Sequence, residues 1–533
     1  MTLLTLNDHV AFVATPQANP LLKGISRGIE KESLRVTPSG HIASSPHPKT
    51  LGSALTHPSI TTDYSEALLE FITAPSCSID TVLKELEDLH RFTYRQIGNE
   101  LLWVSSMPCQ LGADGDIPIA QYGSSNIAQM KEIYRKGLGH RYGRAMQTIA
   151  GIHYNFSLPD KLWEALKEKQ NSQLSLQDFK SEGYFKLIRN FRRYAWLLLY
   201  LLGAAPAVCR SFVASRDHHL SPVGEDSHSL YQPNATSLRM GDLGYQSKAQ
   251  SKLDISYNSL EQYIGTLRAA LAKPYQQYAD IGLKDEQGAY NQLNTHILQI
   301  ENEFYSPIRP KRTAAKDETP LQALERHGVE YIEVRCLDVN PLIPCGIDAQ
   351  TIRFLDTFLL FCLFSDSPDI SDEDSQRLSE NMLQTVYNGR DPELTLWQNQ
   401  NKRSLRHWGK EILENMLPIA HQLDLANQSN NQYSQVLTEM QGKISKSQAT
   451  PSAQMLAEMT QNNETYFRMA MRKAKEQRDQ FTQGKIEAEL EKTYSELAKT
   501  SHNKQAQIEN NDTQSFDRYL ADYWTMSKTT VQE

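Results

Sequence analysis

The sequence is poor in cysteine and lacks a secretory start. Its 533 residues include six cysteines, and no two of them have C-x-x-C spacing. A disulfide framework is therefore not expected in so long a chain, and reduced thiols are the default. The first residues have no basic start, and Asp8 and His9 interrupt their apolar run. Because this is not a signal peptide pattern, we expect a cytoplasmic protein.

Long apolar runs and concentrated positive charge are also lacking. The most apolar stretch, Tyr194 to Cys209, contains Gly203 and Pro206 and is shorter than the about 20 residues that cross a bilayer. We expect a buried helix that ends near Gly203, and no membrane partner. The net charge is -8, which argues against nucleic acid as a partner, because phosphate backbones select clustered positive charge.

Several catalytic and repeat signatures are absent. No period of about 20 to 50 residues recurs, which argues against a repeat architecture. The sequence contains no G-x-x-x-x-G-K-[ST] and no H-E-x-x-H. If the protein uses ATP, it does so without a P-loop. A G-x-S-x-G match at 24–28 precedes a strand-like segment, whereas a nucleophile elbow needs a helix there.

The pattern of apolar residues predicts an α+β fold. Alternation or β-rich composition predicts strands at 28–36, 67–73, 152–158, 296–303 and 330–339. Helical periodicity predicts helices at 79–98, 184–202, 258–273 and 350–364. Strands and helices do not alternate regularly, so the sheet should be mainly antiparallel. The chain becomes polar and helical in pattern after about residue 365. We therefore expect a catalytic domain at 1–365 and a mostly helical region at 366–533 that packs on it.

Acidic side chains recur on single faces of these strands. Glu30 and Glu32 in GIEKESLRV point the same way, because successive strand residues alternate between faces. A lone E-x-E is usually a surface feature. Here, however, Glu333 and Arg335 share a face of EYIEVRC, and a single Glu70 interrupts the apolar run LLEFI.

A histidine segment adds to this pattern and suggests a metal site. In GIHYNFS, His153 and Asn155 share one face, and aromatic residues occupy the other. Carboxylates gathered on one polar face would raise each other's pKa values, and divalent cations relieve that repulsion. Oxygen ligands with few or no thiolates favour Mg²⁺ or Mn²⁺. Together with a nearby arginine, they suggest phosphoryl transfer from a nucleotide.

Longer motifs carry a family resemblance. From about residue 20 to 365 the chain resembles glutamate–cysteine ligase of the proteobacterial type, in the segments LKGISRGIEKESLRV, LGSALTHPSITTDYSEALLEFIT, YRKGLGHRYGRAMQTIAGIHYNFS, ATSLRMGDLGYQSKAQ, LQIENEFYSPIRPKR and GVEYIEVRCLDVNP. The resemblance implies a glutamine synthetase-like, curved, mainly antiparallel sheet with a concave active-site face, surrounded by helices.

The resemblance also implies the reaction. The family joins the γ-carboxylate of L-glutamate to the amine of L-cysteine with ATP, through a γ-glutamyl phosphate, as the first step of glutathione biosynthesis. Glutathione is the implied feedback inhibitor. No additional ATP-grasp domain fits in the last roughly 170 residues, so the chain resembles the monofunctional ligase and not the fused enzyme that also makes glutathione. We expect a monomer.

Site residues are carried over only where they match the family's motifs. The implied metal ligands are Glu30, Glu32, Glu70, His153 and Glu333. Arg335 would meet the transferred phosphoryl group, and Asp63 is a second catalytic candidate near glutamate. The implied substrate-binding residues are Arg239, Tyr134, Gln147, Tyr245, Tyr305 and Tyr64. Tyr64 departs from the phenylalanine expected there, and its hydroxyl bears on the fit of the cysteine side chain.

Three other interpretations remain open from the residues. A ligase of the same superfamily could use another amine in place of cysteine. A non-catalytic metal-binding or regulatory protein could be built on the same scaffold. The basic run 309–312 is either a group of phosphate contacts or a solvated loop.

Overall fold

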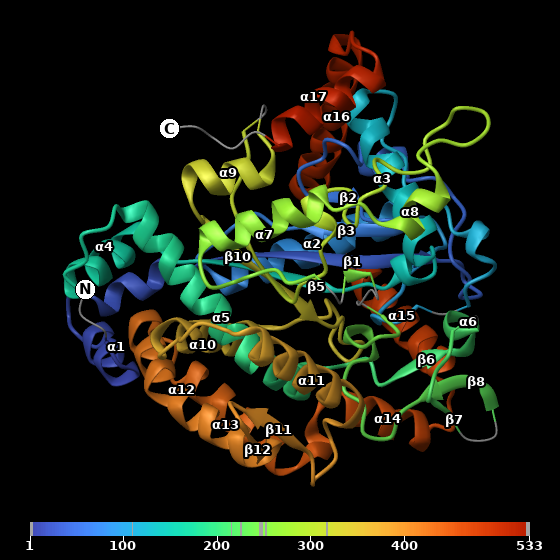
Figure 1. Cartoon of the computed structure of the whole chain (residues 1–533). Coiled ribbons are helices and arrows are strands. Elements are labelled where there is room, and N and C mark those ends of the chain that lie inside the picture. The colour runs from blue at the N-terminus through green and yellow to red at the C-terminus, as the bar shows by residue number, and fades with distance from the viewer. Residues whose placement is uncertain are drawn as a thin grey trace.

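The structure is a computed structural model that describes residues 4–108, 110–214, 216–223, 226–244, 249–250, 253–315, 318–484 and 486–528. It is an α+β protein in which helices surround a mostly antiparallel sheet (Figure 1). The fold class expected from the sequence is confirmed at this level.

The strands and helices have the following bounds. The strands are β1 (Ser26–Val36), β2 (Ile60–Thr62), β3 (Leu68–Ile72), β4 (Leu101–Leu102), β5 (Ile152–Ser157), β6 (Ala207–Cys209), β7 (Ser221–Val223), β8 (Asp226–Tyr231), β9 (Ile308–Lys311), β10 (Tyr331–Leu337), β11 (Thr395–Gln398) and β12 (Asn401–Ser404). The helices up to residue 364 are α1 (Leu6–Val13), α2 (Ile79–Gln96), α3 (Asn126–Tyr142), α4 (Asp160–Lys169), α5 (Leu176–Leu202), α6 (Arg210–Val213), α7 (Leu260–Ala272), α8 (Gln276–Ile281), α9 (Pro320–His327) and α10 (Ala349–Phe364). Those beyond it are α11 (Asp372–Asn388), α12 (Leu405–Asn427), α13 (Gln432–Ser445), α14 (Pro451–Gln461), α15 (Tyr466–Thr482), α16 (Ala488–Asn511) and α17 (Phe516–Lys528).

The main sheet has the order β2-β3-β1-β5-β10-β9, and β4 pairs with one end of β1. All of these pairings are antiparallel. Strand β1 is the longest and lies between β3 and β5, so its side chains reach both halves of the sheet. Two smaller sheets, β11-β12 and β6-β8-β7, lie outside the main one.

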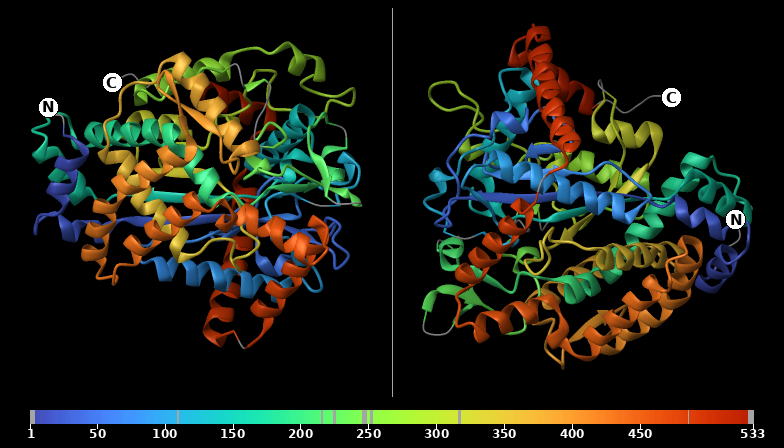
Figure 2. Two further views of the ribbon diagram at one scale, coloured as in Figure 1. Left: turned by 90° about the horizontal axis from the view of Figure 1, so that it is seen from below. Right: turned by 180° about the vertical axis from the view of Figure 1, so that it is seen from behind.

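One face of the main sheet is covered by apolar helices. Ile29 and Tyr154 are fully buried on this face, and the Tyr154 hydroxyl donates to Asp356 of α10. Helix α2 contacts β1, and α5 contacts β9 and β10; seen from behind, α2 runs along the sheet (Figure 2). Because side chains alternate along a strand, the acidic residues of β1 lie on the opposite face.

The helix predictions are confirmed, with shifted ends. Helices α2, α7 and α10 lie within two residues of their predicted bounds. Helix α5 begins eight residues earlier than predicted, where the Ser175 hydroxyl accepts a hydrogen bond from the Asp178 amide. It ends at Leu202, next to Gly203, as predicted for a buried helix. None of the described helices is long and apolar enough to cross a membrane.

Four predicted strands are confirmed as β1, β3, β5 and β10, but a strand at 296–303 is wrong. That segment contains a 3₁₀ turn at Glu301–Glu303 and no strand. Its polar groups bond to neighbouring side chains and loops instead of to a sheet edge. The Gln299 amide donates to the carbonyl of Tyr134 in α3, and Glu303 accepts from Arg141 at 3.0 Å.

The chain after residue 365 is mostly helical and contacts the rest of the protein at several places. Helix α15 packs on α2, α12 and α13 pack on α10, and α17 packs on α3. The division into domains at 1–365 and 366–533 stays a prediction.

The expectation of reduced thiols is wrong for one cysteine. Cys77, Cys336, Cys345 and Cys362 are free, whereas Cys209, in β6, is disulfide-bonded. Sequence spacing could not reveal this, because a disulfide depends on which residues the fold brings together.

Candidate active site

The strand register gathers the acidic residues on the open face of the sheet. Glu32 of β1 lies opposite Glu70 of β3, and Glu30 lies opposite His153 of β5. Glu333 of β10 lies opposite Asn155 on the other side of β5. Directly opposed residues of antiparallel strands point to the same face. We call the five residues Glu30, Glu32, Glu70, His153 and Glu333 the acidic cluster.

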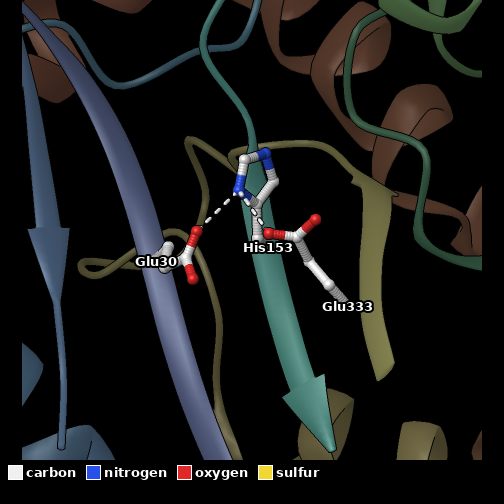
Figure 3. Close-up of side chains that lie close together, drawn as sticks. All are labelled: Glu30, His153 and Glu333. Carbon is white, nitrogen blue, oxygen red and sulfur yellow. Dashed lines mark hydrogen bonds and ion pairs between the residues drawn. The ribbon is translucent and has the colours of Figure 1, made fainter. Parts of the chain in front are cut away.

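Three members of the acidic cluster converge closely enough to share one cation. Ligand atoms of Glu30, His153 and Glu333 all lie within 4.8 Å of one another, and their side chains point toward one another from three strands (Figure 3). The His153 Nδ1 is 3.0 Å from Glu30 Oε2 and 3.9 Å from Glu333 Oε1. The Asn155 amide donates to Glu30 Oε1 at 2.8 Å, which orients that carboxylate.

Cations gather beside Glu333, at one end of the acidic cluster. The Arg335 Nη1 is 2.9 Å from Glu333 Oε2, and the Lys311 Nζ is 3.4 Å from Glu333 Oε1. Burial raises the pKa of Glu333, but the charges of Arg335 and Lys311 outweigh it and hold the pKa well below its ordinary value. Glu333 is therefore ionised, and two cations already lie beside it.

Glu30 and His153 form a hydrogen-bonded pair within the acidic cluster. Burial raises the pKa of Glu30, yet the hydrogen bond with His153 lowers the net value. Burial and the charge of Arg335 lower the pKa of His153, so the imidazole is neutral at pH 7. A neutral imidazole and ionised carboxylates are the forms in which these groups bind metal ions.

Glu32 and Glu70 form the end of the acidic cluster that is rich in carboxylates. Burial and the charge of Asp63 raise the pKa of Glu32 to about 8. Burial and the charges of Glu30 and Asp63 raise the pKa of Glu70 well above its ordinary value. Like charges in a buried site disfavour one another's ionisation. A bound cation would reverse both shifts.

The donor set fits a hard divalent cation. It offers carboxylate oxygens and one imidazole nitrogen, with no thiolate in the acidic cluster. Such ligands suit Mg²⁺ and Mn²⁺ better than soft metals. In the described chain no lysine or arginine forms an ion pair with Glu32 or Glu70, so a bound cation would supply the positive charge that is lacking there and lower both pKa values.

Arg239 lies beneath this end of the acidic cluster and is almost fully buried. Its Nη2 donates to the carbonyl of Arg335 at 3.0 Å. A Cβ on Gly151 would come within 2.0 Å of that nitrogen, so only glycine allows the guanidinium to approach. The Gly151 amide in turn donates to Glu32 Oε2 at 2.6 Å.

Asp63 follows β2 directly and lies near the acidic cluster, since its charge acts on Glu32 and Glu70. Its carbonyl accepts hydrogen bonds from the Tyr122 hydroxyl at 3.1 Å and from Arg135. The backbone at Asp63 is therefore held from the side of α3.

The predicted substrate residues fall into separate groups. The Gln147 amide donates to the Tyr305 hydroxyl at 3.0 Å, so the fold brings these two together. Tyr134 lies on α3 and packs with residues of α17, without a direct bond to that pair. Tyr245 lies outside the described residues.

Tyr64 is buried, and its hydroxyl lies against α3. That oxygen is 2.6 Å from where a Cβ on Gly139 would be, and it has no hydrogen-bond partner among the described residues. The extra hydroxyl, compared with phenylalanine, thus occupies space that a glycine leaves open.

The sequence did not single out several polar residues that surround the acidic cluster. The sequence motifs assign no role to Asn155. Lys131 and Arg135 of α3 are not among the predicted site residues. Residues three and four apart share a face of a helix. Because Lys131 precedes the predicted site residue Tyr134 by three positions, this spacing could have identified Lys131 as a site residue. Lys311 was recognised only as part of a basic run.

Comparisons with known proteins agree with this geometry. The family model described as glutamate-cysteine ligase matches residues 10–385. The chain is 50% identical over 523 residues to a glutamate–cysteine ligase of Alcanivorax borkumensis, covering 97% of this chain and 99% of that one. It is 48% identical over 506 residues to one of Saccharophagus degradans, covering 95% of each.

Two solved structures are similar as well. A glutamate–cysteine ligase of Francisella tularensis in complex with AMP has a TM-score of 0.89 and 36% identity, covering 95% of this chain and 98% of that one. A bifunctional glutathione synthetase of Pasteurella multocida has a TM-score of 0.67 and 24% identity, covering 89% of this chain and 54% of that one. The second similarity concerns the fold alone.

Proposed function

Because the chain belongs to the glutamate–cysteine ligase family, we propose that it joins the γ-carboxylate of L-glutamate to the amine of L-cysteine at the expense of ATP. The product, γ-glutamylcysteine, would enter glutathione biosynthesis. The observation that carries the proposal is the convergence of Glu30, His153 and Glu333 within 4.8 Å beside the Arg335 guanidinium. Use of a nucleotide is supported by the AMP complex of the similar Francisella enzyme.

The chemistry requires activation of a carboxylate. An amine does not displace oxide from a carboxylate, because the oxygen leaves too poorly. The γ-carboxylate of glutamate therefore attacks the γ-phosphorus of ATP, which releases ADP and forms γ-glutamyl phosphate. The cysteine amine then attacks the acyl carbon, an amide bond forms and phosphate leaves.

The five residues of the acidic cluster would hold Mg²⁺ or Mn²⁺, which supplies charge neutralisation and Lewis-acid polarisation at the triphosphate. Arg335 stabilises the transferred phosphoryl group, because its guanidinium donates from a partly buried position beside Glu333. The raised pKa values of Glu32 and Glu70 support cation binding at their end of the acidic cluster.

The amine of cysteine must lose a proton to attack. Asp63 is one acceptor, since it lies near Glu32 and Glu70, and the departing phosphate is the other. Tyr134, Tyr245 and Tyr305 would recognise cysteine and keep water from the acyl phosphate. Gln147 and Tyr64 would line the same subsite, and Arg239 would bind substrate.

Five finer points belong to the same proposal. The sheet would be a relative of the glutamine synthetase sheet, with its concave face at the acidic cluster. The chain would work in the cytoplasm as a monomer, and glutathione would inhibit it because it contains the γ-glutamylcysteine unit. Residues 1–365 would form the catalytic domain.

The test is an assay for ADP formation with glutamate and Mg²⁺, in which the second amino acid is varied. Turnover should be highest with cysteine and should require glutamate. Equal turnover with unrelated amines would indicate a ligase of different specificity. MgATP binding without any turnover would contradict the proposal that the chain is a catalyst.

A further inference from the structure

Lys131 of α3 is a cation near the acidic cluster that the mechanism above does not use. It precedes Tyr134 by three residues and Arg135 by four, so all three share one face of the helix. The Lys131 Nζ lies 5.0 Å from the centre of the Tyr122 ring, and the Arg135 guanidinium lies 4.6 Å from the same centre. Both cations thus stack on one aromatic ring.

The Tyr122 ring ties these cations to the end of β2. Its hydroxyl donates to the carbonyls of Thr62 at 2.8 Å and Asp63 at 3.1 Å. Next to them, Thr61 lies opposite Glu70 in the sheet. Lys131 therefore lies on the side of the acidic cluster where Glu70 and the neighbouring Asp63 are found.

The ammonium group of Lys131 is not neutralised there. In the part of the chain that the structure describes, it forms no hydrogen bond and no ion pair, although it is half-buried. Burial and the charge of Arg135 lower its pKa to about 8, whereas Glu70 and Asp63 act in the opposite direction. The two carboxylates are thus close enough to act on Lys131 but do not pair with it.

The cations at the other end of the acidic cluster differ in this respect. Arg335 and Lys311 both contact Glu333, at 2.9 and 3.4 Å, and Arg135 donates to the carbonyls of Asp63 and Lys131. A partly buried ammonium without a hydrogen-bond acceptor is costly. Among the residues that the structure describes, the Lys131 ammonium has an aromatic ring but no anionic partner beside it, so it is available to an anionic group of a ligand.

We propose that Lys131 binds the α-carboxylate of an amino-acid substrate at the Asp63–Glu70 end of the acidic cluster. This inference rests on the proposed function, which supplies two zwitterionic substrates. Lys131 receives the carboxylate, and Asp63 lies nearby for the substrate ammonium, so the two charges of the substrate meet opposite charges. The triphosphate belongs to the other end, where Arg335 and Lys311 lie.

The test compares two lysines of α3. Lys131→Gln removes the charge and keeps a side chain of similar reach. Lys136→Gln is the matched control, because 38% of the Lys136 side chain is exposed and, among the described residues, it pairs with Glu132 of the same helix alone. For each enzyme, KM is measured separately for glutamate, cysteine and MgATP, together with kcat and the thermal midpoint.

We expect Lys131→Gln to raise KM for one of the two amino acids about 10- to 100-fold, the loss typical of a hydrogen bond to a charged group. KM for MgATP should stay unchanged, and Lys131→Arg should recover most of the affinity. The control should behave as the wild type. If Lys131→Gln does not fold, Lys131→Met replaces it as the neutral variant.

Substrates without the α-carboxylate identify which amino acid is bound. These are 4-aminobutanoate in place of glutamate and cysteamine in place of cysteine. The wild type should prefer the complete amino acid, and Lys131→Gln should lose that preference for the one whose KM rose. Where an analogue is not turned over, the KM comparison decides by itself.

The outcomes separate this inference from the proposed function. Absence of ADP formation by the wild type with glutamate and cysteine would refute the function and the inference with it. An active wild type with unchanged amino-acid KM values in a folded neutral variant would overturn the role of Lys131 alone. A rise in KM for MgATP only would likewise overturn it and assign Lys131 to phosphate.

Discussion

Arg27 and Glu32, two buried charged residues on opposite faces of β1, have opposite surroundings. On the helix side, Arg27 is fully buried and lies 2.7 Å from Asp356 of α10, which also accepts a hydrogen bond from the Tyr154 hydroxyl at 2.6 Å. On the open side, Glu32 faces another carboxylate, Glu70, across the strand pair. The first set is matched within the protein, and the second is not.

This difference separates a structural charge from a site. In a buried ion pair whose hydrogen bonds are satisfied, the attraction between the charges roughly offsets the free energy of removing them from water. Such a pair holds the elements that carry it in place. Buried carboxylates beside one another destabilise the fold until a cation joins them. In the proposed function, Mg²⁺ or Mn²⁺ would replace the protons that the raised pKa values of Glu32 and Glu70 favour in the metal-free protein.

The largest expected effect is on stability, at the matched pair. Asp356→Asn leaves the Arg27 guanidinium buried without its counter-charge and should lower the free energy of unfolding by about 3–5 kcal/mol. Glu373→Gln, at an exposed pair with Arg377 on α11, should cost less than about 1 kcal/mol. Urea and thermal unfolding measure both, and equal effects would remove the distinction between the two faces.

The next effect is on activity, at the open face. Glu333→Gln should lower kcat/KM by about 10²–10³-fold, because one preorganised charge at the transferred group is lost. The thermal midpoint should fall as well, because Arg335 and Lys311 lose the buried carboxylate with which they pair. Glu330→Gln, just before the same strand, is the control, since 44% of the Glu330 side chain is exposed and it lies beside Arg312. Near wild-type turnover of Glu333→Gln at saturating Mg²⁺ would contradict a role as ligand.

A smaller effect should follow metal addition. Mg²⁺ and MgATP should raise the thermal midpoint of the metal-free protein. A ligand at 100 times its Kd adds about 2.7 kcal/mol to the free energy of unfolding. Glu70→Gln should raise the midpoint without metal and reduce the gain with it. A thermal midpoint that does not change on addition of Mg²⁺ or MgATP would argue against a cation among these carboxylates.

The smallest effect is a pH dependence of the metal-free protein. The pKa of Glu32 rises from 4.5 to about 8 on folding, so the folded state holds a proton that the unfolded state releases. The resulting stability is complete below pH 4.5 and is lost as pH rises through 8. In EDTA, unfolding free energy should fall by roughly 1 kcal/mol or more between pH 6 and 8.5, and Glu32→Gln should flatten the curve.

Local patterns were sufficient for some elements and not for others. Alternation or β-rich composition predicted β1, β5 and β10, and in β5 and β10 the apolar and polar side chains lie mainly on opposite faces. The same reasoning failed at 296–303, where side-chain bonds to other segments replace strand pairing. It also gave no sign that Cys209 lies in a disulfide, because a disulfide depends on which residues the fold brings together.

By itself, the sequence determined that Glu30 and Glu32 share a face, that Glu333 shares one with Arg335, and that the chain resembles a ligase family. Only the tertiary structure decided that β3, β1, β5 and β10 are neighbours in a register that brings these groups together. It also decided that Lys131 approaches them from α3. The physical reason is the distance along the chain over which each feature is decided. The face to which a side chain points follows from the geometry of a single strand, whereas the pairing register and the order of the strands follow from packing across the whole chain.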